Sequence, residues 1–143
     1  DPGRVGRVTQ VNPDLIRRLV DGGFIPVIAP IAVDADGAPL NVNADTVAGK
    51  VAEAMGARKL VLMTDIPAVR GREGEDRSSL SSAEVDELIA EGVIDGGMIP
   101  KVRCAQEALA GGVRKAHIID GRVQHAMLLE IFTDKGVGTE LTR

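Results

Sequence analysis

A lysine at the start of a predicted helix is the first residue whose position suggests that it binds a ligand. Gly96 and Gly97 precede a helix predicted over about 99–109, and Lys101 falls in its first turn. Free amide groups and the helix dipole make such a turn attractive to anions and unfavourable for a cation. An anionic ligand bound by both the amides and the ammonium would explain the lysine, whereas an exposed surface lysine is the alternative.

A second group of polar residues lies where a predicted hairpin runs into a helix. Asn41, Asn43 and Asp45 place two amides and a carboxylate at a helix N-terminus. The alternative to a ligand site is that Asn43 or Asp45 simply caps the helix, since both residue types are favoured caps. One cap does not require three polar side chains, which keeps the functional reading open.

Thr64 and Asp65 directly follow a near-continuous apolar run, 59–64, which is typical of a buried parallel strand. In open α/β sheets ligands bind beyond the carboxyl ends of the strands, where this pair would meet a nucleotide. Turn formation by Asp65 ahead of Pro67 is the alternative.

Caps, glycine stops and apolar periodicity predict the elements that must position these residues. The helices are expected at about 13–21, 44–55, 82–91, 99–109 and 126–132. The strands are expected at 25–30 (buried), 31–33 with 40–42 (a hairpin), 59–64, 116–119 and after 132, with a β-prone stretch at 5–11 and an exposed loop at 70–79. Alternating strands and helices indicate an α/β fold with a largely parallel sheet covered on both faces.

Composition narrows the classes of protein. A length of 143 residues suits one domain with a real core. A net charge of −4 without a long basic run, and two Phe with no Trp or Tyr, argue against nucleic-acid binding. The longest apolar stretch, Ile25–Val33, contains two prolines and is too short to span a bilayer.

No metal or known nucleotide motif is present. Cys104 is the single cysteine, so it forms neither an internal disulfide nor a metal cluster alone, and it favours a reducing compartment. His117 and His125 do not form a metal motif, and His117 within an apolar strand reads as a core histidine. Neither a Walker A pattern nor a kinase catalytic-loop pattern occurs. The chain begins at Asp1-Pro2, and we expect a fragment or a processed form.

Seven segments, in order and covering nearly the whole chain, resemble the acetylglutamate kinases of the amino acid kinase superfamily. They are Val5-Gly-Arg-Val8, Ile25-Pro-Val-Ile-Ala-Pro30, Asn41-Val-Asn-Ala-Asp-Thr46, Leu62-Met-Thr-Asp-Ile-Pro67, Gly96-Gly-Met-Ile-Pro-Lys101, His117-Ile-Ile-Asp-Gly-Arg122 and Glu130-Ile-Phe-Thr133 with Gly136-Val-Gly-Thr139. Each is weak alone, whereas all seven in this order are specific.

The resemblance implies a three-layer αβα sandwich, of which residues 1–143 are the C-terminal, ATP-binding domain. It implies ATP- and Mg²⁺-dependent phosphorylation of the side-chain carboxylate of N-acetyl-L-glutamate, in arginine biosynthesis. The N-terminal half of the family, with its glycine-rich phosphate loop and a second catalytic lysine, is absent from this chain. We therefore expect the chain to hold nucleotide but not to turn over alone.

The resemblance also assigns roles to residues. Lys101 would steady the charge on the transferring phosphoryl group, Asp45 would hold the lysine in place, and Asn41 with Asn43 would meet acetylglutamate. The nucleotide-binding residues implied are Thr64, Asp65, Ile66, Val69, Arg70, Val93, Ile94, Asp95 and Met98. No metal ligands of the protein are implied.

Regulation and partners follow from the same resemblance. His117, Glu130 and Gly136 fall on positions similar to an arginine-inhibition site, where a Glu could pair with a guanidinium. The full-length enzyme is expected to be a homo-oligomer in the cytoplasm, or in the plastid of a plant or alga, and relatives from phototrophs bind a P-II regulatory protein.

Three other functions remain open. Another carboxylate or carbamate kinase of the superfamily is the nearest, and a non-catalytic nucleotide- or arginine-sensing module is the second. A sensing module has no need of a lysine such as Lys101. A purely structural domain is the third, and it predicts that Asn41, Asp45, Thr64 and Lys101 scatter in space.

Overall fold

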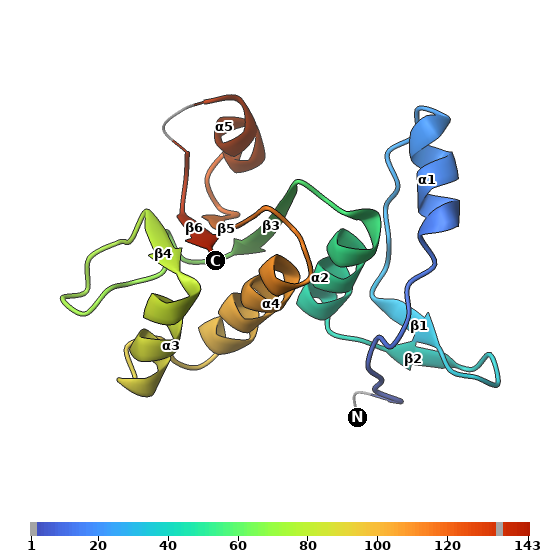
Figure 1. Cartoon of the computed structure of the whole chain (residues 1–143), viewed down its shortest axis with the longest axis horizontal. Helices are drawn as coiled ribbons and strands as arrows, with labels where there is room; N and C mark the ends of the chain where they lie inside the picture. The colour runs from blue at the N-terminus through green and yellow to red at the C-terminus, as the bar shows by residue number, and fades with distance from the viewer. Residues whose placement is uncertain (1–2, 134–135) are drawn as a thin grey trace.

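The computed structural model describes residues 3–133 and 136–143, so Asp1-Pro2, with which the sequence begins, lies outside the described residues (Figure 1). The helices are α1 (Pro13–Asp21), α2 (Ala44–Met55), α3 (Ser82–Ala90), α4 (Met98–Ala110) and α5 (Ala126–Phe132). The strands are β1 (Ile31–Val33), β2 (Pro39–Asn41), β3 (Lys59–Thr64), β4 (Ser79–Ser81), β5 (Lys115–Asp120) and β6 (Thr139–Thr142). All five helices predicted from the sequence are confirmed.

The main sheet is mixed and mostly parallel, with strand order β3-β5-β6-β4. β3 pairs with β5 in parallel, β4 pairs with β6 in parallel, and β5 pairs with β6 antiparallel. Thr64 and Asp120 are partners at the carboxyl ends of β3 and β5. The strand end that carries Thr64 and Asp65 therefore lies beside the end of β5, at one edge of the sheet.

Helices cover both faces of this sheet, as the α/β prediction required. Figure 1 shows α5 on one side and α2, α3 and α4 on the other. The core between the sheet and the three helices contains side chains that are fully buried, such as Leu80, Val85, Val102, Leu109 and Ile118. A core of aliphatic residues thus forms without aromatic side chains.

Local sequence explains where the helices that carry the site begin. Asn43 caps α2 by accepting a hydrogen bond from the Thr46 N–H at 3.1 Å. α3 begins with a capping box, in which Ser81 accepts from the Glu84 N–H and Glu84 accepts from the Ser81 N–H. Such caps satisfy N–H groups that the helix itself leaves free.

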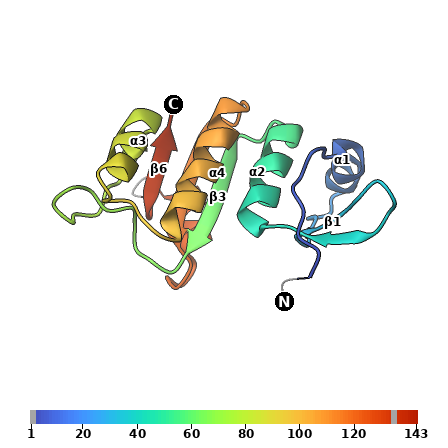
Figure 2. The same ribbon diagram turned by 90° about the horizontal axis from the view of Figure 1, so that it is seen from below.

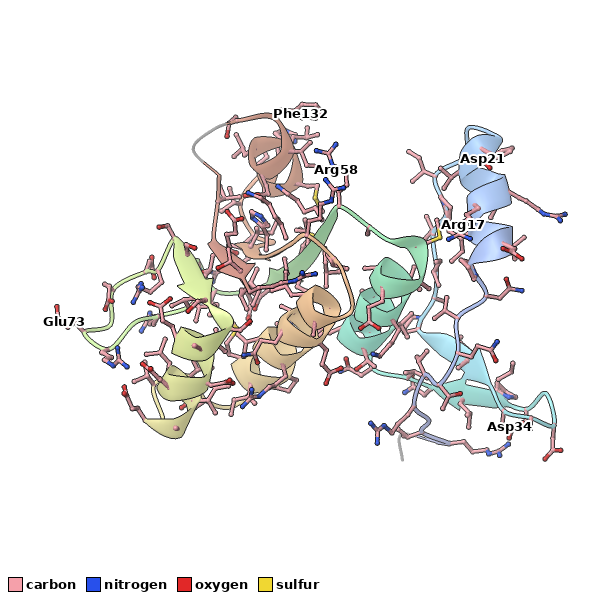
Figure 3. All side chains as sticks on the ribbon, viewed as in Figure 1. Arg17, Asp21, Asp34, Arg58, Glu73 and Phe132 are labelled. Carbon is pink, nitrogen blue, oxygen red and sulfur yellow. The ribbon has the colours of Figure 1, made fainter. Side chains whose placement is uncertain are left out.

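The N-terminal region, which we define as residues 3–43, stands beside the sheet rather than within it (Figures 1 and 2). It consists of α1 and the antiparallel hairpin β1–β2, whose turn holds Asp34 in an ion pair with Arg4 at 2.7 Å (Figure 3). Only Val42 of its apolar residues is buried, and α1 buries none. The region contacts α2, which α1 touches and which shares cavities with residues 8–11 and 26–30.

The prediction of a buried strand at 25–30 is wrong for this structure. The segment is not part of a strand: the Pro30 carbonyl accepts from the Val42 N–H, but no ladder forms, and Ile25 and Val27 are 90% and 95% exposed. An apolar run shows that burial is favourable, but it does not supply a neighbouring strand, and Pro26 and Pro30 lack the N–H that a ladder needs. The β-prone stretch at 5–11 likewise forms only a bridge from Val5 to Asn41.

A short strand was missed between the predicted loop at 70–79 and the predicted helix at 82–91. β4 occupies Ser79–Ser81 and pairs with Glu140–Thr142 of the last strand, with Leu80 fully buried. Three residues ending a charged, glycine-containing segment carry too little periodicity to predict a strand.

No helix in the described part of the chain is long and apolar enough to cross a membrane.

Candidate functional site

The carboxyl edge of the main sheet gathers the ends of several elements. In Figure 2 the N-terminal ends of α2 and α4 and the arrowhead of β3 lie along the same side of the molecule. Helix N-termini offer free N–H groups, and the carboxyl edge of an α/β sheet is where ligands bind. This edge is therefore the candidate site.

Lys101 and Asp45 meet at this edge. The Lys101 Nζ lies 3.1 and 3.0 Å from the two carboxylate oxygens of Asp45, and both side chains are 22% exposed. Lys101 comes from the first turn of α4 and Asp45 from the first turn of α2. The purely structural reading predicted that these two residues scatter, and they do not.

No side chain caps the N-terminus of α4, but the Met98 and Ile99 N–H groups donate to the main-chain carbonyls of Asp95 and Gly96, and Pro100 has no N–H. Gly97 at the cap position makes no side-chain capping bond, and no acidic residue lies in the first turn. A helix end of this kind is positive, and Lys101 adds a full positive charge to it. The lysine ammonium retains exposure on one side, where an anion could reach it.

Cys104 holds the main chain of Asp45 against α4. Its thiol donates a hydrogen bond to the main-chain carbonyl of Asp45, with Sγ 2.9 Å from the oxygen. A Cβ on Gly49 would lie 2.8 Å from this sulfur, so α2 and α4 approach closely because residue 49 is glycine. Burial raises the pKa of Cys104 to about 11, which keeps the thiol protonated and able to donate at neutral pH.

The two asparagines predicted to bind substrate lie beside α2, and the hydrogen bonds of the Lys101 side chain go to Asp45 rather than to either of them. Asn43 is the cap of α2, which matches the simpler interpretation of its type and position. Asn41 ends β2, is exposed, and exchanges main-chain bonds with Arg4 and Gly6. The amide side chain of Asn41 therefore remains available for a ligand.

The predicted nucleotide residues divide between the edge and the core. Thr64, Asp65, Ile66, Arg70 and Asp95 are exposed or half-buried, and the Thr64 hydroxyl lies 3.4 Å from the Asp65 carboxylate. The side chains of Val69 and Ile94 are buried in the core, whereas Val93 and Met98 are half-buried and pack against it. The main-chain N–H and carbonyl of Val69 are already bonded to the Thr139 hydroxyl and the Arg77 N–H, and the Ile94 N–H donates to the Leu88 carbonyl.

A separate buried cluster joins the three residues predicted to bind arginine. The His117 Nδ1 lies 2.6 Å from the Glu130 carboxylate, and a Cβ on Gly136 would lie 3.2 Å from that carboxylate. Lys59 completes the cluster with its Nζ 2.9 Å from Glu130. A cavity of about 240 Å³ opens beside these four residues.

The charges in this cluster are set by burial and by its contacts. Burial lowers the pKa of His117, although the Glu130 carboxylate opposes this effect. Burial would raise the pKa of Glu130, but hydrogen bonds from Lys59 and the Val137 N–H and nearby positive charges lower it overall. A neutral His117 therefore donates from Nδ1, which leaves its Nε2 buried without a partner among the described residues.

Sequence reasoning missed Lys59 as a member of this cluster. A basic residue that opens an otherwise apolar strand was the available signal, because such a side chain must leave the core or find a carboxylate. The partner, Glu130, lies 71 residues later, which no local pattern reveals.

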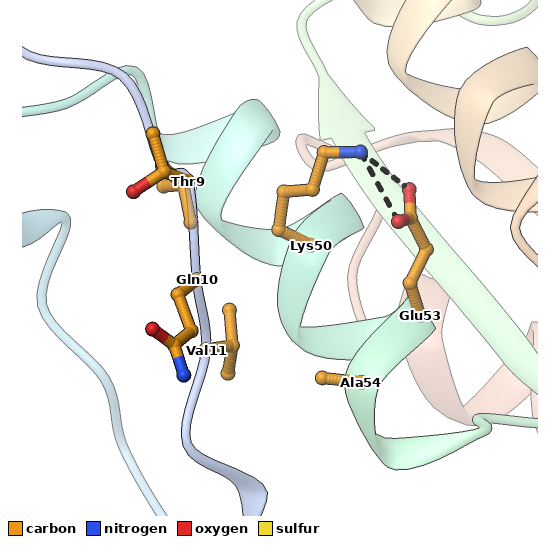
Figure 4. A pocket seen from close by; sticks show the side chains of 7 residues that line it. Thr9, Gln10, Val11, Lys50, Glu53 and Ala54 are labelled. Carbon is orange, nitrogen blue, oxygen red and sulfur yellow. Dashed lines mark hydrogen bonds and ion pairs between the residues drawn. The ribbon is translucent and has the colours of Figure 1, made fainter.

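The other polar groups of the described residues form no metal-binding cluster. Among the residues that the structure describes, no three His, Cys, Asp or Glu side chains are grouped so as to hold an ion. A cavity of about 320 Å³ lies between residues 8–11 and α2, but its charged residues, Lys50 and Glu53, pair with each other (Figure 4). This cavity offers no uncompensated charge to a ligand.

Comparison with known proteins shows which family this chain matches and which curated proteins are similar to it. A family model described as the amino acid kinase family matches residues 1–120. A curated acetylglutamate kinase of Stutzerimonas stutzeri (strain A1501) is 60% identical over 142 residues, covering 99% of this chain and 47% of that protein. One from Geobacter sp. (strain M21) is 57% identical over 141 residues. The chain spans about half the length of the curated relatives it matches.

Solved structures agree on the fold. The N-acetylglutamate synthase of Neisseria gonorrhoeae, complexed with coenzyme A and L-arginine, superposes with a TM-score of 0.89 at 26% identity, covering 96% of this chain and 32% of that one. The carbamate kinase of Giardia lamblia bound to AMP-PNP superposes with a TM-score of 0.70 at 18% identity, covering 97% of this chain and 52% of that one. The second likeness shows the shared fold alone.

Proposed function

The chain belongs to the amino acid kinase family, and from that premise we propose that it is the ATP-binding half of an acetylglutamate kinase. The proposed reaction transfers the γ-phosphoryl group of ATP to the side-chain carboxylate of N-acetyl-L-glutamate. The high identity to curated acetylglutamate kinases supports this substrate over carbamate. The chain alone would bind nucleotide without turnover.

The contact between Lys101 and Asp45 is the observation that carries the proposal. A carboxylate attacking a phosphoryl group brings two anions together, so positioning and positive charge supply most of the catalysis. Lys101 lies at the positive end of α4, and its Nζ forms an ion pair with the Asp45 carboxylate at 3.0 Å. The positive end of the α4 dipole and the Lys101 ammonium would together meet the phosphates of ATP.

Asp45 would act through Lys101 rather than on the nucleotide. A carboxylate facing the ammonium keeps the flexible lysine side chain in one orientation when no phosphate is bound. Phosphoryl transfer requires little covalent help from the protein, so orientation of the charge is the main contribution. The Cys104 bond to the Asp45 carbonyl ties the same residue to α4 from its main chain.

Mg²⁺ would neutralise charge on the ATP phosphates in the complete enzyme. Because the described residues form no cluster of acidic side chains for an ion, the phosphates and water would supply most of its ligands.

Calorimetric titration with ATP and Mg²⁺ tests the proposal. We expect saturable binding by this chain, and roughly 10- to 100-fold weaker binding by Lys101→Ala, because a charge-assisted contact is lost. Lys115→Ala removes a lysine at the opposite edge of the sheet and should leave the affinity unchanged. A folded chain that binds no ATP, or one in which Lys101→Ala binds as tightly as the wild type, would contradict the proposal.

Arginine binding at the second cluster is a further candidate function. It is supported by the buried Glu130 carboxylate, the unpartnered His117 Nε2 and the adjacent cavity. The structurally similar synthase of Neisseria gonorrhoeae was solved with L-arginine. In this chain Lys59 forms an ion pair with the Glu130 carboxylate, with which the guanidinium of a bound arginine would pair. Arginine must therefore displace Lys59 from Glu130.

Titration with L-arginine separates this candidate from the kinase proposal. Saturable binding that is lost in Glu130→Gln and kept in Lys101→Ala would support an arginine site independent of the nucleotide. Equal arginine binding by the wild type and Glu130→Gln would refute it.

A further inference from the structure

The turn after β5 brings a second pair of a basic side chain and a carboxylate, Arg122 and Asp120, to the edge that carries the candidate nucleotide site. Asp120 is aligned with Thr64 across the sheet, and the Gly121 N–H donates to the Thr64 carbonyl at 2.8 Å. A Cβ on Gly121 would lie 3.4 Å from that same oxygen and 3.2 Å from the end of the Met63 side chain. The turn is therefore attached directly to the strand end that precedes Asp65.

Asp120 holds Arg122 in a fixed orientation. The Arg122 Nε and Nη2 each lie 2.9 Å from a different oxygen of the Asp120 carboxylate, and the Arg122 N–H also donates to Oδ1. The Asp120 side chain is only 9% exposed, whereas that of Arg122 is 61% exposed. A buried carboxylate thus presents an exposed guanidinium at the edge, in the bidentate geometry that Arg favours.

This arrangement exceeds what the turn itself requires. The hydrogen bond from the Arg122 main-chain N–H to Asp120 closes the turn, and any non-proline residue at position 122 could make it. The guanidinium has five N–H groups, of which Asp120 takes two. The others have no acceptor among the described residues and face solvent.

The surrounding charges indicate which part of a nucleotide would fit. The hydrogen bonds to Asp120 raise the pKa of Arg122, and the negative charge of Asp65 raises it further, so this guanidinium lies within electrostatic reach of a second carboxylate. One positive charge beside two negative charges disfavours a phosphate. It suits a ligand that donates O–H groups to Asp65 and accepts N–H donors at neutral ring nitrogens, as a nucleoside does.

We propose that Arg122, oriented by Asp120, contacts the nucleoside part of the nucleotide rather than its phosphates. This assignment rests on the proposed nucleotide site and adds a residue to it. The phosphates lie with Lys101 at the start of α4, and the ribose and base lie against Asp65 and Arg122 at the ends of β3 and β5.

Parallel titrations with ATP–Mg²⁺ and with adenosine test the assignment. Arg122→Gln should weaken both ligands by the same factor, on the order of tenfold, because one charge-assisted hydrogen bond is lost from their common part. Arg122→Lys keeps the charge but not the fork, and should resemble Arg122→Gln. Lys101→Ala should weaken ATP alone. Arg114→Gln, an exposed arginine that precedes β5 at the opposite edge, is the matched control.

Each result is decisive. Unchanged affinity of Arg122→Gln for both ligands overturns the assignment and leaves the nucleotide site standing, and a loss confined to ATP reassigns Arg122 to the phosphates. A wild-type chain that binds neither ligand overturns the proposed function together with this assignment. Thermal unfolding of each variant excludes misfolding, since Arg122 is exposed and its replacement should leave the melting temperature near that of the wild type.

Discussion

The N-terminal region differs from the sheet body, which we define as residues 44–133 with 136–143, in how far its apolar side chains are buried. Both regions contain many aliphatic residues. In the sheet body, apolar residues of β3, β5, β6, α3 and α4 close a core in which many side chains are fully buried. Of the sixteen large apolar residues that are exposed in the described structure, ten lie in the N-terminal region. Hydrophobic content alone therefore does not decide which part of a chain is stable.

The difference lies in available partners. β3 and β5 pair along their whole length and are covered by α4, so each buried side chain meets others. The segment 25–30 belongs to no strand, and among the helices and strands α1 contacts mainly α2. Local devices such as the Asn12 cap and the β1–β2 hairpin shape this region, while the sheet body owes its stability to its core.

The largest effect should come from one truncation made in each region. Ile118→Ala, at a fully buried position of β5, should lower the free energy of unfolding by about 2–5 kcal/mol, through lost burial and the cavity left behind. Ile25→Ala, at a 90% exposed position, should change it by less than about 0.5 kcal/mol. Urea unfolding monitored by circular dichroism measures both. A similar loss for both variants would mean that the N-terminal region is packed after all.

A smaller effect should separate the two helix caps. Asn43→Ala removes the cap of α2, which joins the core through Gly49 and Ala52, and should cost about 1 kcal/mol of unfolding free energy. Asn12→Ala removes the cap of α1, which buries no residue, so α1 should fray while the main transition stays in place. Hydrogen exchange resolves the two helices, and an equal shift of the main transition would show that α1 folds with the sheet body.

Sequence reasoning succeeded where local chemistry decides. The capping box at Ser81, the glycine stop at Gly56 and the short apolar helix ending at Phe132 predict helices that the structure contains. Lys101 stood out because a lysine at a helix start needs an explanation, and it is the residue that meets Asp45. Such signals are complete within a few residues.

It failed where a distant partner decides. The run at 25–30 reads as a strand, but only the presence of a neighbour could make it one, and β4 escaped notice because its partner, β6, lies about 60 residues later. Lys59 joined the Glu130 cluster through a contact that no spacing predicts. The assigned roles of Asn41, Asn43 and the nucleotide residues stay predictions from resemblance.

The smallest effect expected is a pH dependence confined to the sheet body. Because the pKa of His117 is lowered below its usual 6.5, the folded state binds fewer protons than the unfolded state. This contribution to stability is complete above pH 6.5 and is lost as the pH falls through the folded pKa. The N-terminal region has no histidine and should not take part.

Replacing the histidine tests this origin. His117→Gln, which can still donate to Glu130, should flatten the fall in unfolding free energy below pH 6.5, whereas Glu130 loses its own contribution only at lower pH, below its usual 4.5. His125→Asn is the control, since Asn tolerates the left-handed conformation that His125 adopts. An unchanged slope in His117→Gln would assign the dependence to other groups.

The most direct test of the account is a map of the backbone amide signals of the labelled chain during titration with ATP and Mg²⁺. A nucleotide site at the carboxyl edge predicts shifts that cluster at Asp45, Thr64–Asp65, the turn at 120–122 and the start of α4 from Gly97 to Lys101. The N-terminal segment 24–33 and the Glu130 cluster should stay unchanged. Shifts centred on the cavity beside Glu130, or spread over the exposed apolar residues of 24–33, would contradict it.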